Sequence, residues 1–78
     1  MKIPRDISTA RLVRMLKSIG YHDERHRGTH IRLLHAGNPA HAITLLNGDP
    51  ISIPALRAIL VAAAEAKYWP VDVVLDLL

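Results

Sequence analysis

The spacing of the apolar residues changes twice along the chain, and these changes limit the folds that it can adopt. Leu12, Leu16 and Ile19 recur at helical spacing, whereas apolar and polar residues alternate between residues 21 and 47, as in half-buried strands. Helical spacing returns over residues 54–78. The order helix, three strands, helix and short helix is satisfied most simply by one antiparallel sheet with helices on a single face, an α+β fold.

Cap residues predict where the helices begin and end. Ser8 can cap the first helix, and Gly20 can end it. Pro54 suits the first residue of the second helix, and Pro70 starts a short third helix. Because the chain has 78 residues and no internal repeat, we expect a single domain over residues 1–78.

Two connections rich in turn residues are expected to join the strands. The sequence RGT at residues 27–29 contains a glycine that can adopt a positive φ, and it joins the first strand to the second. The sequence AGNPAH at residues 36–41 joins the second strand to the third, where Ile43 and Leu45 continue the alternation. These connections predict two successive hairpins.

Alternation on the middle strand separates two sets of side chains. Ile31 and Leu33 face one way, whereas His30, Arg32 and Leu34 face the other. If the helices cover one face of the sheet, the second set lies on the open face. His30 and Arg32 are therefore expected to be accessible to a ligand.

The composition excludes several classes of site. The chain has no Phe and one Trp, so its core must be aliphatic, and it has no Cys. The lack of cysteine excludes disulfides, thiolate zinc sites and cysteine nucleophiles. The charged start MKIPRD and the absence of an apolar run of about 18 residues predict a soluble cytoplasmic protein with no membrane partner.

Positive charge is concentrated in the first half of the chain. Residues 1–35 carry eight basic side chains against three acidic ones: Lys2, Arg5, Arg11, Arg14, Lys17, Arg25, Arg27 and Arg32 against Asp6, Asp23 and Glu24. A basic half of this kind favours polyanions such as nucleic acid. An ordinary solubilising surface has the same composition, and charge alone does not separate the two interpretations.

Three histidines recur every four residues, a spacing that would align metal ligands on a helix. His22, His26 and His30 do not fit that interpretation, because Gly28 and the alternating pattern indicate strands and the neighbouring arginines repel a cation. We therefore expect no metal and no cofactor, with metal binding by these histidines as the weaker alternative. In a regular strand His22 and His26 would share a face, and His30, across the turn, would not lie on it. His35 and His41 are expected at strand ends, solvated or partly hydrogen-bonded, with no role.

His30 is the candidate catalytic residue. RNA cleavage needs a base for the 2′-hydroxyl proton and cations for the phosphate, and an imidazole can take or give a proton near neutral pH. Arg25, Arg27 and Arg32 are candidate phosphate contacts. A surface histidine in a phosphate-binding patch explains the same residues equally well, and His26 is a weakly supported second acid.

The chain resembles HicA-type toxins over almost its whole length. The matching words are KIPRD at 2–6, LVRMLKSIGY at 12–21, RGTHIRL at 27–33, HAITLLNGDPISI at 41–53, LRAIL at 56–60 and VDVVLDLL at 71–78. The resemblance implies a fold like that of double-stranded RNA-binding domains and metal-independent cleavage of messenger RNA. It implies that His30 is catalytic, with Gly28 and Thr29 in the same motif, and that a HicB-type antitoxin is the protein partner.

The chain departs from the family pattern at three places. HDE at 22–24 replaces apolar residues and predicts a short or frayed first strand. Pro54 and Ala55 replace a Gly-Thr pair, and Trp69 replaces a small polar residue. Passive duplex binders of this fold dock through a lysine-rich helix start, for which only Arg57 is available here. Two alternatives remain: a non-catalytic module that binds RNA or a partner, and an inactive relative that keeps antitoxin binding.

Overall fold

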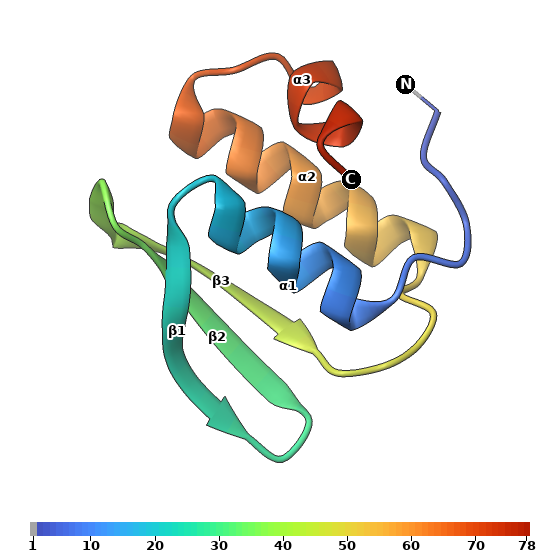
Figure 1. Ribbon diagram of the computed structural model, residues 1–78, viewed down its shortest axis with the longest axis horizontal. Coiled ribbons are helices and arrows are strands. Elements are labelled where there is room, and N and C mark those ends of the chain that lie inside the picture. The colour runs from blue at the N-terminus through green and yellow to red at the C-terminus, as the bar shows by residue number, and fades with distance from the viewer. Residues whose placement is uncertain (1) are drawn as a thin grey trace.

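A computed structural model describes residues 2–78, with residues 38–40 described by their backbone alone (Figure 1). Its elements, in chain order, are α1 (Thr9–Ser18), β1 (Tyr21–Arg27), β2 (His30–His35), β3 (Asn38–Leu46), α2 (Ile53–Lys67) and α3 (Val71–Asp76). The strands form one antiparallel sheet in the order β1-β2-β3. The helices lie on one side of this sheet. The predicted α+β class and the order of the elements are confirmed.

Both ends of α1 follow the cap residues. The Ser8 side chain accepts a hydrogen bond from the Arg11 N–H at 3.1 Å, and the helix begins at the next residue. At the other end, Gly20 adopts a φ of +110°, which an L side chain rarely adopts. The chain can therefore turn directly from α1 into β1.

The start of α1 is also held by the loop that follows β3. The Asp49 carboxylate accepts a hydrogen bond from the Thr9 N–H at 2.6 Å, and the Thr9 hydroxyl donates to the Gly48 carbonyl at 2.7 Å. A carboxylate at this position satisfies a free N–H and interacts favourably with the positive end of the helix dipole. The loop between β3 and α2 is thereby attached to α1.

The strands differ from the sequence prediction in length. β1 is seven residues long, so the prediction of a short first strand is wrong. The second connection is also shorter than predicted, because β3 begins at Asn38 and only residues 36 and 37 remain in the turn. The Gly37 N–H donates to His35 Nδ1 at 3.0 Å, and the Ala36 N–H donates to the Gly20 carbonyl at 2.8 Å. The first bond lies within the turn between β2 and β3, and the second attaches this turn to the junction of α1 and β1.

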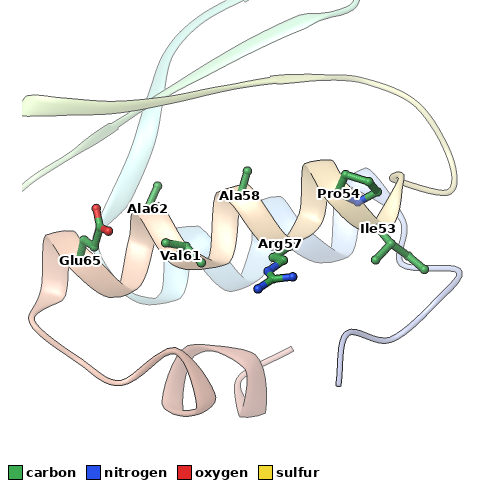
Figure 2. A pocket seen from close by; sticks show the side chains of 7 residues that line it. All are labelled: Ile53, Pro54, Arg57, Ala58, Val61, Ala62 and Glu65. Atoms are coloured by element: carbon green, nitrogen blue, oxygen red, sulfur yellow. The ribbon is translucent and has the colours of Figure 1, made fainter. Parts of the chain in front are cut away.

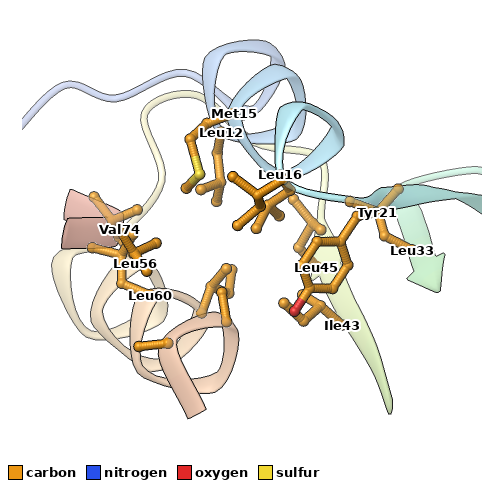
Figure 3. Close-up of a cluster of buried hydrophobic side chains, with 14 of the residues drawn as sticks. Leu12, Met15, Leu16, Tyr21, Leu33, Ile43, Leu45, Leu56, Leu60 and Val74 are labelled. Carbon is orange, nitrogen blue, oxygen red and sulfur yellow. The ribbon is translucent and has the colours of Figure 1, made fainter. Parts of the chain in front are cut away.

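The core lies between the sheet and the helices (Figure 3). The largest of the completely buried side chains are Leu12, Leu16, Leu33, Leu56, Leu60 and Val74, and their positions follow the apolar spacing of their elements. Tyr21 is the one aromatic ring of Phe, Tyr or Trp type in this buried cluster as described. Within residues 2–78, no helix is long and apolar enough to cross a membrane.

A tyrosine occupies the position at the end of α2 that helices usually give to glycine. Tyr68 has left-handed backbone angles, with φ 57° and ψ 35°. The Trp69 N–H donates to the Ala64 carbonyl and the Tyr68 N–H to the Glu65 carbonyl, which is the Schellman pattern. The Tyr68 side chain is 96% exposed, so no packing offsets the backbone strain. Trp69 is 38% exposed, with Lys67 Nζ 5.1 Å from its ring centre.

Replacing Tyr68 by glycine is therefore expected to stabilise the fold. A left-handed conformation costs an L-residue about 1–2 kcal/mol, which glycine would relieve. Part of this stabilisation is offset because glycine has more conformational freedom in the unfolded chain. We expect the free energy of unfolding in urea to rise by about 0.5–1 kcal/mol. The matched control is Ala66→Gly, inside the same helix, which should lower it by about 1 kcal/mol. A loss of stability in Tyr68→Gly would contradict the inference that the backbone is strained at Tyr68.

Candidate active site on the open face of the sheet

The strand register brings the four predicted site residues with charged or titratable side chains onto one face of the sheet. His30 pairs directly with Arg27, and Arg32 pairs with Arg25. Paired residues of neighbouring strands point to the same side. All four side chains are exposed. Ile31 and Leu33, which alternate with His30 and Arg32 along β2, are buried under the helices. Arg25, Arg27, His30 and Arg32 thus form one surface, which we call the basic face.

This arrangement depends on an irregularity in β1. Strict alternation from the buried Tyr21 would turn Arg25 and Arg27 toward the helices. The register instead shifts between Asp23, which pairs with Leu33, and Arg25, so that Glu24 is an extra residue in β1. A bulge of this kind changes which residues point to which face. It places the two arginines on the same side as His30.

The same bulge separates two histidines that alternation places together. His22 pairs with Leu34, on the face of the sheet that carries His30, whereas His26 pairs with the buried Ile31 and points to the helix side. Two expectations are therefore wrong: His22 and His26 do not share a face, and His22 does share one with His30. There His26 lines a shallow groove beside α1 and is separated from His30 by the sheet.

The backbone around His30 is held from both sides. Gly28 has a φ of +54°, and no atom lies within 4 Å of where its Cβ would be, so glycine is needed here for its conformation and not for space. The Thr29 carbonyl accepts a hydrogen bond from the Asn47 N–H at 2.6 Å, which attaches the turn to the end of β3. His30 also pairs with Leu46 of β3. The imidazole therefore projects from a fixed backbone into solvent.

Charge on the basic face is only partly neutralised. Arg32 Nε donates to Glu24 Oε2 at 2.7 Å, and both side chains are about half exposed. Arg25 and Arg27 form no ion pair among residues 2–78. An exposed pair contributes about 0–1 kcal/mol, so a phosphate could displace Glu24 from Arg32 at small cost. The face can thus present two or three guanidinium groups beside one imidazole.

Within residues 2–78, no second imidazole lies near His30 on this face. His22 is aligned with Leu34, four residues along β2, which corresponds to about 13 Å. That separation is too long for both rings to act on one phosphodiester directly. The second-acid hypothesis for His26 is also disfavoured, since it lies on the opposite side of the sheet. Acid and base steps at this site would therefore depend on His30 and on water.

A neighbouring apolar side chain was not singled out from the sequence. Leu46, directly opposite His30 on β3, is 63% exposed. Because Ile43 and Leu45 point inward, alternation predicts that Leu46 points outward. Alternation does not predict that Leu46 lies beside His30, because that depends on the register of the strands. The candidate site therefore combines an imidazole, guanidinium groups and one exposed apolar surface.

A second group of titratable residues is buried at the other end of β2. His35 is 6% exposed, and its ring centre lies 4.9 Å from that of Tyr21 and 6.4 Å from that of His41. His41 Nε2 is 2.8 Å from the Tyr21 hydroxyl. Burial raises the pKa of Tyr21 to about 12, so the phenol stays protonated. Its hydroxyl can therefore donate a hydrogen bond to His41 Nε2. His35 follows Ile31 and Leu33 at strand spacing, and the alternation could have predicted its burial.

His35 is held in its neutral form. Its Nδ1 accepts the hydrogen bond from Gly37, which places the proton on Nε2, and Nε2 has no hydrogen-bond partner among the described residues. Burial lowers the pKa of His35, and the charges of Lys67 and His41 lower it further. Among the described residues, no three His, Cys, Asp or Glu side chains are arranged to hold a metal ion. His35 is therefore best understood as a neutral core residue.

Stability is expected to fall on acidification below about pH 6.5 because of His35. The unfolded chain binds a proton at His35 near its ordinary pKa of 6.5, whereas the folded chain binds it only at lower pH. The unfolded state thus takes up more protons as the pH falls, at a cost of at most about 1.4 kcal/mol per pH unit for one histidine. The free energy of unfolding, measured with urea between pH 5 and 7.5, should change less with pH in His35→Leu than in the wild type. Equal slopes would contradict this assignment.

No protein-family model, curated protein or solved structure matches the chain.

Proposed function

We propose that the protein is a metal-independent RNA endonuclease of the HicA toxin type, with His30 as its catalytic residue. One observation carries this proposal: an exposed imidazole lies on the same open sheet face as two unpaired guanidinium groups. The order of helices and strands also suits a fold like that of double-stranded RNA-binding domains. The resemblance in RGTHIRL at residues 27–33 adds the same catalytic assignment.

The chemistry proposed for this face is an internal transesterification of RNA. His30 accepts the proton of a 2′-hydroxyl, whose oxygen attacks the adjacent phosphorus. The bond from phosphorus to the 5′-oxygen breaks, and the leaving oxygen takes the proton of the imidazolium, directly or relayed by a water molecule. The products are a 2′,3′-cyclic phosphate and a 5′-hydroxyl, and His30 returns to its neutral form. No step needs a metal ion or a cofactor.

The arginines have a distinct task in this mechanism. Arg25 and Arg27 would contact the non-bridging phosphate oxygens, which gain negative charge in the transition state. Arg32 would join them when phosphate displaces Glu24. Gly28 and Thr29 form the turn that fixes the direction of His30, and Leu46 offers an apolar surface to a nucleobase. A HicB-type antitoxin, as the proposed protein partner, would cover the same face.

The proposal is tested by incubating the purified chain with end-labelled RNA in the presence of EDTA. We expect new fragments that carry 5′-hydroxyl and 2′,3′-cyclic phosphate ends. A DNA of the same sequence should stay intact because it has no 2′-hydroxyl. Cleavage of the DNA, a requirement for added metal, or failure to cleave any RNA tested would each overturn the proposed mechanism.

A second candidate is a non-catalytic module that binds RNA through the basic face. It is favoured by the absence, within residues 2–78, of a second imidazole near His30 on that face. Such a module would bind single-stranded RNA with an affinity that falls steeply with salt, by about 0.7 logarithmic units per phosphate contact for each tenfold rise in salt. It would produce no new RNA ends, which distinguishes it from the nuclease.

A further inference from the structure

The exposed side of α2 forms a shallow groove away from the basic face. We call it the α2 groove, and it is lined by Ile53, Pro54, Arg57, Ala58, Val61, Ala62 and Glu65 (Figure 2). Val61 and Ala62 are partly exposed, and the other five residues are exposed. The lining is therefore mostly small or apolar, with Arg57 and Glu65 as its two charged residues.

The two charges of the groove are placed symmetrically about Val61. Arg57 and Glu65 each lie four residues from Val61, which corresponds to about 6 Å along the helix axis in either direction. They are about 12 Å apart along the axis, so they do not pair with each other. Within residues 2–78, neither forms an ion pair with any other side chain. Each charge is thus available to an opposite charge on another molecule.

We propose that the α2 groove binds the α2 groove of a second copy of this chain, with the two helices antiparallel. A two-fold axis near Val61 would place Arg57 of each copy opposite Glu65 of the other. Such an interface is self-complementary, as two-fold symmetry requires. Ala58 and Ala62 allow the helices to approach closely, because interaxial distances depend on side-chain size at the contact.

The charge pattern favours this occupant over others. A parallel pair of helices would place like charges together, and a strongly charged partner such as RNA would meet both an attractive and a repulsive end. A second copy of the same groove satisfies both charges at once. Because α2 lies in the helix layer, the dimer would leave both basic faces exposed on the other side of the sheet.

The proposal is tested by a charge exchange across the proposed two-fold axis. Analytical ultracentrifugation of the full chain from about 1 μM to about 1 mM, the range of weak dimers, should show concentration-dependent dimers of the wild type. Arg57→Glu and Glu65→Arg each turn both ion pairs into repulsions, and each should raise the dimer dissociation constant about tenfold or more. The double variant restores opposite charges and should dimerise within about threefold of the wild type.

Matched measurements separate this effect from misfolding and from net charge. Arg14→Glu, on the exposed side of α1 and outside the α2 groove, changes net charge as Arg57→Glu does and should leave dimerisation unchanged. Circular dichroism melting confirms that each variant is folded. A wild type that stays monomeric over the whole range, singles that dimerise normally, or a double variant that is not rescued would each overturn the proposal.

Discussion

Replacing His30 by alanine is expected to slow RNA cleavage by at least about 100-fold, since positioned acid and base groups contribute about 10²–10⁴ to such rates. No other imidazole lies close enough on the basic face to take over the proton transfer. The fold should persist, because the His30 side chain is exposed and contributes little to the core. The measurement is the single-turnover rate on end-labelled RNA in EDTA, together with growth arrest after induction in a bacterium.

The chain supplies its own control histidines for this experiment. His22→Ala removes an imidazole from the same face about 13 Å away, and His26→Ala removes one from the opposite side of the sheet. Both variants should cleave within about threefold of the wild type if proton transfer depends on His30 alone. Undiminished cleavage by His30→Ala would contradict the assignment of His30 as the catalytic residue. A large loss in His26→Ala would instead show that proton transfer also depends on the helix side of the sheet.

Apolar spacing was sufficient to predict the α+β class and the order of the elements, because burial has a different period in helices and strands. Ile31 and Leu33 were placed correctly on the inner face, and Ser8 and Gly20 marked the ends of α1. The length of β1 was predicted wrongly from the polar run HDE at 22–24. That strand lies at the sheet edge, where only Tyr21 among its residues is buried, so apolar side chains are not required for it to pair.

The candidate site was less predictable than the fold because the faces of β1 depend on one extra residue. A bulge at Glu24 reverses the direction of every later side chain in that strand, and nothing in the local sequence marks it. The sequence therefore brought Arg25 and Arg27 near His30 only along the chain. Their position on one face follows from pairing with β2, which is a long-range property.

The same limit explains the features that sequence reasoning did not find. The ion pair between Arg32 and Glu24 joins residues eight apart across a hairpin. The charges of Arg57 and Glu65 became informative only when α2 was seen to keep one side uncovered. Local patterns predict which side of an element is apolar, whereas tertiary contacts decide which of its remaining sides stay exposed.

The second large effect is expected in the core. Leu33→Ala should lower the free energy of unfolding by about 2–5 kcal/mol, because Leu33 is completely buried between the sheet and the helices and truncation leaves a cavity. A domain of this size has a total stability of roughly 4–12 kcal/mol, so this one change could remove a large part of it. Urea unfolding followed by circular dichroism measures the loss.

The matched control for Leu33 is its neighbour on the same strand. Leu34 points to the open face and is only half buried, so Leu34→Ala should cost about 1 kcal/mol or less. The two variants remove the same atoms from adjacent residues. The difference between their losses in free energy of unfolding measures the stability gained from packing the helices on one face of the sheet. Equal losses would mean that both faces of β2 are covered. In that case His30 would not be open to RNA, and the proposed active site would fail together with the one-sided arrangement of helices.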